Sequence, residues 1–359
     1  MAVCPNCGNS STGKRFCTHC GTELSKTLAP AVPAAGFILS SSPPPASGAL
    51  AGRMLDQKYY LESKLGVGGM GTVYRARRLM IGDTAAVKVL HPEQMADSTA
   101  VERFRREAQT AARLKHPNVV TVYDFGVSKD GLAYLVMELA EGESLGRLIE
   151  QQGMLPEATA AEIIRQVCAA MDEAHRQGVV HRDIKPDNIL VRTMPNEIHV
   201  KVLDFGIAAV RDITVSKLTR TGSILGTPYY MSPEQCLGEE LDGRSDIYGL
   251  GIVLFEMLTG VVPFNSPTPT AVVVQQVNQA PPLLRTLNAN ISTAVEAVVL
   301  RALEKQREAR PQTAGDLERE LIAAINGMPA APVRPVTTTP VSNFMPGPIS
   351  APTEVLAPA

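Results

Sequence analysis

The chain has 359 residues, of which 45% are hydrophobic, and its 34 basic and 36 acidic side chains leave a net charge of -2. That length can bury one large core or two medium ones, while a balanced charge without long blocks of one sign argues against wholesale nucleic-acid binding. No basic start followed by an apolar run opens the sequence, so we expect no secretory signal and a cytoplasmic protein.

Residues 1–24 carry two cysteine pairs, Cys4/Cys7 and Cys17/Cys20, each followed by a glycine. Glycine allows the positive φ at which backbone amides approach thiolates. Four thiolates complete a tetrahedral coordination sphere and leave no position for a water, so the pattern predicts a structural Zn²⁺ in a short ribbon. Free or redox-active thiols are the alternative, and a reducing cytoplasm disfavours a disulfide.

Two segments have the composition of linkers. Proline, alanine, serine and glycine dominate residues 25–57, with three consecutive prolines at the centre, which predicts a linker with polyproline II stiffness. Residues 327–359 have the same bias and are expected to form a disordered tail. The segment between them, 58–326, is expected to be one catalytic domain.

The first motif of that domain is the glycine-rich run from Gly66 to Val73. Gly-x-Gly-x-x-Gly alone is a weak signal, shared with dinucleotide-binding folds in which it opens a helix. Here Thr72 to Ala76 is β-branched and aromatic, so it continues as a strand. The glycines therefore predict a hairpin whose backbone amides close over phosphate oxygens. An ordinary glycine-rich hairpin is the alternative.

The next strand, Ala85 to Leu90, contains a single cation, Lys88, in an apolar run. A buried lysine needs a partner. The apolar spacing from Thr99 to Leu114 predicts a helix, and Glu107, three residues after Phe104, lies on its inward side. Glu107 is thus the candidate partner, although many such glutamates are only solvated helix charges.

The most informative segment is the loop from His181 to Asn188. Such residues are common singly in turns, where they cap backbone groups. Their order is unusual, because Asp183, Lys185 and Asn188 bring a carboxylate, an ammonium and an amide oxygen onto one short loop. Such a loop can line one side of a phosphate site.

Apolar runs at Val179–Val180 and Ile189–Val191 predict short strands on either side of this loop. Another β-type run, Ile198 to Leu203, ends just before Asp204. Two strand ends would therefore deliver Asn188 and Asp204 together and form a metal site.

The longest apolar stretch, Tyr248 to Val262, is interrupted by Glu256 and Gly260. It is shorter than the roughly 20 residues that a membrane-spanning helix needs, so it predicts a buried helix.

The stretch from about 59 to 325 resembles a eukaryotic-like bacterial serine/threonine protein kinase domain. The resemblance implies an α+β bilobal kinase fold, with a β-rich N-lobe and a mainly helical C-lobe, besides the zinc ribbon. It rests on an ordered set of motifs: the glycine-rich loop, Ala86-Val87-Lys88, Glu107, His181-Arg182-Asp183, Asn188, Asp204-Phe205-Gly206, Gly226-Thr227-Pro228 and Ser232-Pro233-Glu234.

This resemblance implies a Mg²⁺-dependent transfer of the γ-phosphate of ATP to Ser or Thr hydroxyls of proteins in bacterial signalling. Asp183 would accept the hydroxyl proton, Lys185 would lie near the transferring phosphate, Lys88 would hold the α- and β-phosphates, and Asn188 and Asp204 would carry Mg²⁺. The residues implied at the nucleotide are Leu65, Gly66, Gly68, Gly69, Gly71, Val73, Ala86, Lys88, Glu107, Met137, Glu138, Ala140, Asn188 and Asp204.

Regulation is implied by Arg182, which precedes Asp183 and is suited to bind a phosphate. Thr219 and Thr221 match positions that related bacterial kinases autophosphorylate.

Two structural pairings are also implied. Glu234 would pair with Arg310, and Asp246 would anchor the catalytic loop, unless it is only a charge near a helix N-terminus.

Two other functions compete with an active kinase. A pseudokinase scaffold would bind nucleotide or partners without transfer, but none of the motif residues that such proteins lose is missing here. Alternatively, the zinc ribbon is the functional head and binds nucleic acid or a protein, with the kinase domain as effector. The sequence favours the active enzyme.

Overall fold

The structure is a computed structural model that describes residues 2–3, 10–11, 50–69, 71–95, 98–195, 197–205 and 228–327. The chain divides into two compact units, Met1–Ala49 and Leu50–Ala359. In the first, β1 (Ala2–Val3) pairs antiparallel with β2 (Ser10–Ser11). All further elements belong to the second unit.

An antiparallel six-stranded sheet forms the N-terminal half of the second unit, in the order β3-β4-β5-β6-β8-β7. Leu50 and Leu55, from the end of the segment expected to be a linker, pack in the core on one side of it. The strands are β3 (Met54–Leu55), β4 (Tyr59–Val67), β5 (Gly71–Arg78), β6 (Thr84–Leu90), β7 (Val122–Val127) and β8 (Ala133–Glu138).

Two helices follow β6, namely α1 (Pro92–Met95) and α2 (Ser98–Ala111). The predicted apolar face of α2 is confirmed, because Phe104 and Ala108 are buried with Leu90 and Leu135 of the sheet. The Phe104 ring meets the edge of Phe125 with centroids 5.6 Å apart. This packing fixes α2 beside the strand that carries Lys88.

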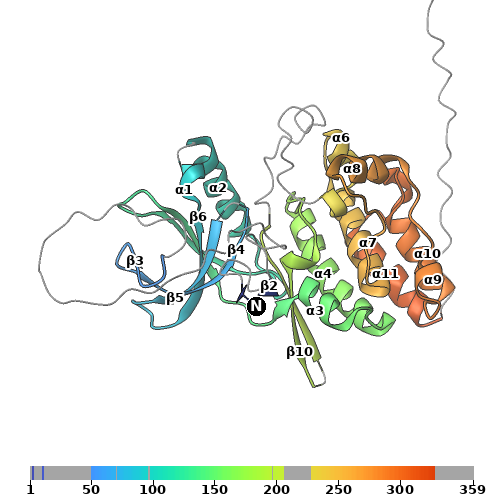
Figure 1. The fold of residues 1–359 in the computed structure, drawn as a ribbon, viewed down its shortest axis with the longest axis horizontal. Coiled ribbons are helices and arrows are strands. Elements are labelled where there is room, and N and C mark those ends of the chain that lie inside the picture. The colour runs from blue at the N-terminus through green and yellow to red at the C-terminus, as the bar shows by residue number, and fades with distance from the viewer. Residues whose placement is uncertain are drawn as a thin grey trace, which may run out of the picture. The chain divides into compact units, whose positions relative to one another are not determined.

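The C-terminal half is mainly helical (Figure 1). At its centre, α7 (Gly243–Thr259) is buried along nearly its whole length, as the apolar stretch predicted. None of the described helices is both long and apolar enough to cross a membrane. The other helices are α3 (Leu145–Gln152), α4 (Glu157–Arg176), α6 (Pro233–Leu237), α8 (Pro269–Asn278), α9 (Leu284–Leu287), α10 (Thr293–Ala302) and α11 (Ala314–Ile325), with short 3₁₀ turns η1 (Pro186–Asn188), η2 (Pro228–Tyr230) and η3 (Arg307–Ala309).

A small sheet lies between the two halves, with strand order β11-β10-β9. Its members are β9 (Glu143–Ser144), β10 (Ile189–Met194) and β11 (Glu197–Val202). Val202 at the end of β11 bridges to Val119, and the Val120 amide donates to the Val202 carbonyl at 3.0 Å. This joint links the segment before β7 to the strand that precedes Asp204.

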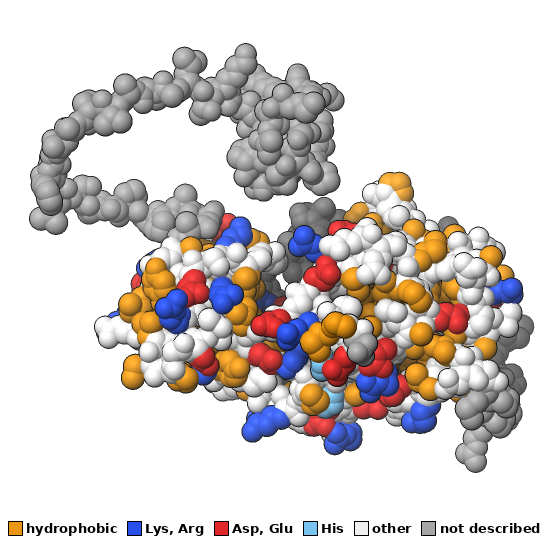
Figure 2. Space-filling model, turned by 90° about the horizontal axis from the view of Figure 1, so that it is seen from below, with side chains coloured by type: hydrophobic (Ala, Val, Ile, Leu, Met, Phe, Trp, Pro, Cys, Tyr) orange, Lys and Arg blue, Asp and Glu red, His pale blue; other side chains and the backbone are white. Residues whose placement is uncertain are grey.

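Acidic and basic side chains interleave over the face of the molecule in Figure 2, without a large area of one sign. This agrees with a net charge of -2 spread along the chain.

Candidate active site

The loop from His181 to Asn188 connects α4 to β10 and is held from below by Asp246. The two Asp246 carboxylate oxygens accept the backbone N–H groups of His181 and Arg182, both at 2.8 Å. His175 of α4 contacts the same carboxylate at 2.7 Å, a partner that sequence reasoning missed. Asp246 is only 2% exposed, which is unusual for a carboxylate unless its oxygens are bonded. The predicted anchoring role of Asp246 is thus confirmed.

The residues just before the loop differ from the prediction. Val179–Val180 is not a strand, because the Val179 amide donates at 2.9 Å to the Ala174 carbonyl and closes the end of α4. Ile189 begins β10, as expected.

Asp183 has its carboxylate fixed by two neighbours on the loop. Lys185 Nζ lies 2.7 Å from Asp183 Oδ2, and Asn188 Nδ2 donates to the same oxygen at 3.0 Å. The preceding residue, Arg182, has a φ of 68°, a left-handed conformation that costs free energy for a residue with a Cβ. With its side chain 40% exposed, Asp183 is a carboxylate that a substrate hydroxyl can reach.

Asn188 and Asp204 are brought together by the backbone. The Leu203 amide donates to the Asn188 carbonyl at 2.8 Å, so the residue before Asp204 is tied to Asn188. Asp204 has a φ of 55°, a second left-handed non-glycine residue in the site. Because the Asn188 Nδ2 group faces Asp183, its Oδ1 oxygen is free of that contact. An amide oxygen and a carboxylate are the hard donors that suit Mg²⁺.

His181 links the two loops. Its Nδ1 accepts the Asp183 amide at 3.2 Å and its Nε2 lies 2.9 Å from the Leu203 carbonyl, which assigns the ring proton to Nε2. The ring meets the edge of Phe205, with centroids 4.8 Å apart. His181 is fully buried, so its role is to hold the two loops together, and its ring is not accessible to solvent.

Lys88 of β6 points toward Asp204. Its Nζ lies 2.8 Å from Asp204 Oδ2, and the lysine side chain is 7% exposed. Lys88 is thus buried beside a carboxylate, but this carboxylate belongs to Asp204, which was not the predicted partner. Glu107 lies on α2, but its side chain is outside what the structure describes, so its pairing with Lys88 stays a prediction.

The glycine-rich run forms the predicted hairpin between β4 and β5, with the Gly68 amide donating to the Gly71 carbonyl at 2.8 Å. The tip is held by His91, which lies between β6 and α1, and by Gln94 of α1, whose Nε2 atoms contact the carbonyls of Gly68 and Gly69 at 3.0 and 3.2 Å.

Apolar side chains beside the hairpin form a cluster that sequence reasoning identified only in part. Ala86 and Met137 are buried together, and the predicted Val73 and Ala140 pack against them. Leu203 joins the same cluster, and its position directly before Asp204 is the signal that could have identified it. Val120 and Leu139 are further members.

Two further predicted positions, Leu65 and Glu138, are not members of this cluster. Leu65 is 51% exposed on β4. Glu138 pairs with Lys201 at 2.8 Å, and its amide donates to the Thr121 carbonyl. Glu138 lies between Met137 and Leu139 of the apolar cluster in the sequence.

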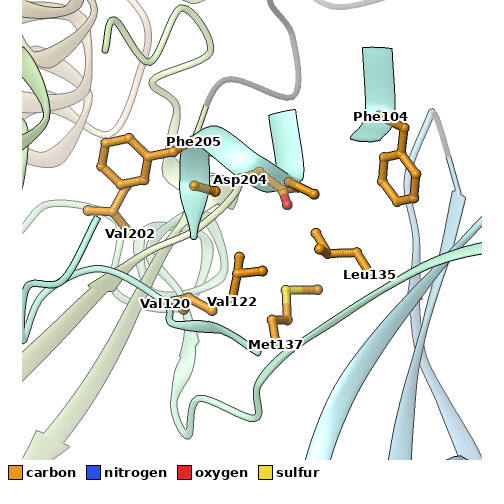
Figure 3. Close-up of a pocket in the computed structure, with 10 residues that line it drawn as sticks. Phe104, Val120, Val122, Leu135, Met137, Val202, Asp204 and Phe205 are labelled. Atoms are coloured by element: carbon orange, nitrogen blue, oxygen red, sulfur yellow. The ribbon is translucent and has the colours of Figure 1, made fainter. Parts of the chain in front are cut away.

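Behind this cluster lies an apolar pocket between α2 and the sheet. Figure 3 shows Asp204 and Phe205 at one side of it and Met137 and Leu135 at another. Phe104 of α2 lines it as well. Asp204 is its only charged lining residue among those described, so the pocket itself offers no place for phosphates.

After the undescribed residues 206–227, the chain resumes at η2 and enters α6. Gln235 of α6, another residue that sequence reasoning missed, donates from Nε2 to the Arg182 carbonyl at 2.7 Å. Its Oε1 accepts the Ser232 amide at 2.9 Å as part of a capping box. The chain after residue 227 is therefore tied to the backbone next to Asp183.

The predicted pair between Glu234 and Arg310 is confirmed, with both carboxylate oxygens bonded at 2.7 and 2.9 Å. Several other predicted positions lie outside the described residues: Cys4, Cys7, Cys17, Cys20, Gly206, Thr219, Thr221 and Thr227.

Comparisons with known proteins cover both parts of the chain. The family described as "Protein kinase domain" matches residues 59–321, and the family described as "zinc-ribbon domain" matches residues 1–24. Serine/threonine-protein kinase pkn3 of Myxococcus xanthus is 42% identical over 277 residues, which are 76% of this chain and 51% of that protein. Serine/threonine-protein kinase PknB of Mycobacterium leprae is 42% identical over 279 residues, 77% and 44% of the two chains. The chain thus spans about half or less of these relatives.

Among solved structures, the Mycobacterium tuberculosis PknI kinase domain is 26% identical, with a TM-score of 0.62 over 77% of this chain and 100% of that one. A second structure of the same domain gives a TM-score of 0.63 over 78% of this chain. Family match, relatives and fold agree with the motifs described above. The chain therefore belongs to the protein kinase family, and carries a zinc-ribbon match besides its kinase domain.

Proposed function

We propose that the protein transfers the γ-phosphate of ATP to Ser and Thr hydroxyls of proteins. The observation that carries this proposal is the Asp183 carboxylate, held at 2.7 Å by Lys185 and at 3.0 Å by Asn188 beside the Lys88–Asp204 pair. Phosphoryl transfer requires little covalent chemistry from a protein, and depends on positioning and on neutralising charge. A fixed carboxylate with two nearby lysines meets that requirement.

Each residue has a separate role in this proposal. Asp183 accepts the proton of the attacking hydroxyl, and Lys185 neutralises charge on the transferring phosphate. Lys88 binds the α- and β-phosphates, and this contact replaces its contact with Asp204. The amide oxygen of Asn188 and the carboxylate of Asp204 would hold Mg²⁺, which neutralises phosphate charge when bound.

The apolar cluster of Val73, Ala86, Met137, Ala140 and Leu203 supports a flat, uncharged ligand such as adenine beside the phosphate groups. The backbone groups around Glu138 are the polar partners available to it. Ser and Thr are preferred over Tyr because Lys185 lies two residues after Asp183, where the related Ser/Thr kinases carry it.

The direct test is transfer of labelled phosphate from ATP with Mg²⁺. We expect the unsubstituted chain to be labelled, and Asp183→Asn to lose transfer by about 100-fold or more while still binding ATP. Asp187→Asn on the same loop is the matched control and should keep activity within a few-fold. A chain that binds ATP but shows no transfer would overturn the enzyme function and leave a nucleotide-binding scaffold.

A further proposal concerns control by autophosphorylation at Thr219 or Thr221. A phosphate there would pair with the arginine next to Asp183. We expect Thr219→Ala/Thr221→Ala to remove phosphate from this loop and to lower activity at least tenfold, as measured by mass spectrometry and initial rates. Full activity without loop phosphate would place the switch elsewhere.

For the zinc-ribbon part, we propose that Cys4, Cys7, Cys17 and Cys20 hold a structural Zn²⁺ and that the ribbon recruits a protein. Thiolate ligands persist in a reducing compartment, and a kinase needs a compartment that contains ATP. Both conditions support a location in the cytoplasm. Loss of partner capture, but not of ATP turnover, on deleting residues 1–24 would identify the recruitment role.

A further inference from the structure

Gln276 of α8 is a polar side chain with no exposed surface. Its Nε2 donates to the Tyr229 carbonyl at 2.7 Å and to the Pro228 carbonyl at 3.2 Å. Its Oε1 accepts the Tyr248 hydroxyl at 2.6 Å. Glutamine is rarely fully buried, and a buried amide with both ends bonded fixes the groups that it joins.

Tyr248 connects this amide to a cation. Tyr248 is fully buried on α7, and its hydroxyl oxygen accepts from Lys305 Nζ at 2.9 Å. The Lys305 ammonium also lies 4.1 Å from the centroid of the Phe264 ring. Within the described part of the chain, Lys305 makes no ion pair with a carboxylate. Its main polar partner is thus the Tyr248 hydroxyl.

The charge of Lys305 gives this chain of hydrogen bonds one direction. An ammonium only donates, so the Tyr248 hydroxyl must direct its own proton to Gln276 Oε1. With Oε1 occupied, the Gln276 amide group must present its N–H donors to Pro228 and Tyr229. Burial, and next the nearby Arg310, lower the pKa of Lys305 to about 8, so the ammonium form persists at neutral pH.

The segment that receives these hydrogen bonds is connected to the catalytic loop. Tyr230 donates to Glu256 of α7 at 2.7 Å, and burial with this contact raises the pKa of the Tyr230 hydroxyl, which stays protonated. Two residues later Ser232 caps α6, whose Gln235 binds the Arg182 carbonyl. A shift of Pro228 and Tyr229 would therefore move the chain that lies against the residue before Asp183.

We infer that Gln276 is a positioning residue for the protein acceptor, and that Tyr248 and Lys305 orient it. Because Gln276 has no exposed surface, it acts through the Pro228–Tyr230 segment and touches neither acceptor nor ATP. Lys88, Asn188 and Asp204, which serve ATP in the proposed function, make no contact with this network. The inference rests on that proposed function.

The test separates the two substrates in kinetics, with dephosphorylated casein as acceptor. We expect Gln276→Leu to raise the KM for casein about tenfold, and to change the KM for ATP less than twofold. Gln275→Leu is the matched control, because it makes the same chemical change one residue away on α8. The control should match the unsubstituted protein in both constants.

A second pair of variants tests whether the residues act as a chain. Tyr248→Phe keeps the ring and removes the hydroxyl, so it should raise the casein KM about threefold without loss of folding. Tyr248→Phe combined with Gln276→Leu should have no greater effect than Gln276→Leu alone, because both act on one contact. Tyr248→Phe also decides the matter if Gln276→Leu does not fold.

An unchanged casein KM in folded variants, or an equal rise in both KM values, would overturn the inference. Additive effects in the double variant would do so too. In each of those outcomes the unsubstituted chain still phosphorylates casein, so the proposed function stands. Absence of transfer by the unsubstituted chain, by contrast, would overturn the proposed function and this inference with it.

Discussion

At the scale of single residues, Arg310 is a buried charge in the helical half whose donors are all hydrogen-bonded. Arg310 has no exposed surface, and its guanidinium donates to both oxygens of Glu234 and to the carbonyls of Glu304, Arg244 and Lys305. The five N–H groups of an arginine thus each have an acceptor. Glu234 also accepts the Ser245 hydroxyl at 2.7 Å. Removing one side of such a pair leaves the other charge buried without compensation.

We expect Arg310→Met to lower the free energy of unfolding by about 3–5 kcal/mol. Arg307→Met is the control, because Arg307 pairs with Glu239 nearer the surface and should cost less than about 1 kcal/mol. Urea unfolding of both variants measures the difference. An equal loss of unfolding free energy in both variants would show that burying the Arg310–Glu234 pair does not make it more important for stability than a pair near the surface.

The same pair predicts a pH dependence. Burial alone would raise the pKa of Glu234, but its hydrogen bonds to Arg310 outweigh this and lower the pKa below the usual 4.5. A lowered folded-state pKa stabilises the protein above pH 4.5, and this contribution is lost as the pH falls below that value. The stability gap between the unsubstituted protein and Arg310→Met should therefore be largest above pH 4.5 and shrink below it, in unfolding curves taken from pH 7 to pH 3.

At the scale of elements, two glycines of the hairpin of β4 and β5 differ in whether the packing of the sheet requires them. A Cβ on Gly71 would lie 2.3 Å from the Val89 carbonyl oxygen of β6, so the strands could not keep their separation. A Cβ on Gly66 would meet no atom within 4 Å. Of these two glycines, only Gly71 is required by the packing of the sheet.

Gly71→Ala should therefore destabilise the fold by about 1–3 kcal/mol, because the backbone of β6 cannot yield as a flexible side chain would. Gly66→Ala should leave the melting temperature unchanged or slightly raised. Thermal unfolding of the two variants checks this. A loss of stability in Gly66→Ala equal to that in Gly71→Ala would contradict the packing argument.

At the scale of the whole molecule, residues 1–49 and 50–359 form separate compact units. A ribbon of 24 residues has almost no apolar core, so metal binding would supply most of its folding free energy, roughly 10 kcal/mol or more. The kinase domain has a large apolar core of its own.

We expect a zinc-selective chelator to remove one Zn²⁺ per chain and to unfold the ribbon, while the kinase domain keeps its melting transition and its ATP turnover. Elemental analysis, calorimetry and activity measurements follow the three properties. Cys4→Ser/Cys7→Ser should give the same result without chelator. Loss of the kinase transition on zinc removal would show that the two units depend on each other.

Much of the catalytic loop was predictable because its functional side chains lie within a few residues of one another in the sequence. Asp183, Lys185 and Asn188 follow one another on one loop, so their mutual contacts depend on short-range backbone geometry. The hairpin, the helix after β6 and the buried helix α7 were predictable for a related reason, since their apolar periodicity is local.

The sequence alone therefore determined the family resemblance, the catalytic loop and the order of the main elements. Tertiary structure alone decided that Lys88 contacts Asp204, that Val179–Val180 ends a helix, and that Gln235 and Gln276 hold the chain after residue 227. Except for the helix end at Val179, these contacts join residues far apart in the chain. A glutamine has no charge and belongs to no motif here, so the sequence does not predict its role. Only the packed structure shows which groups its amide donates to and accepts from.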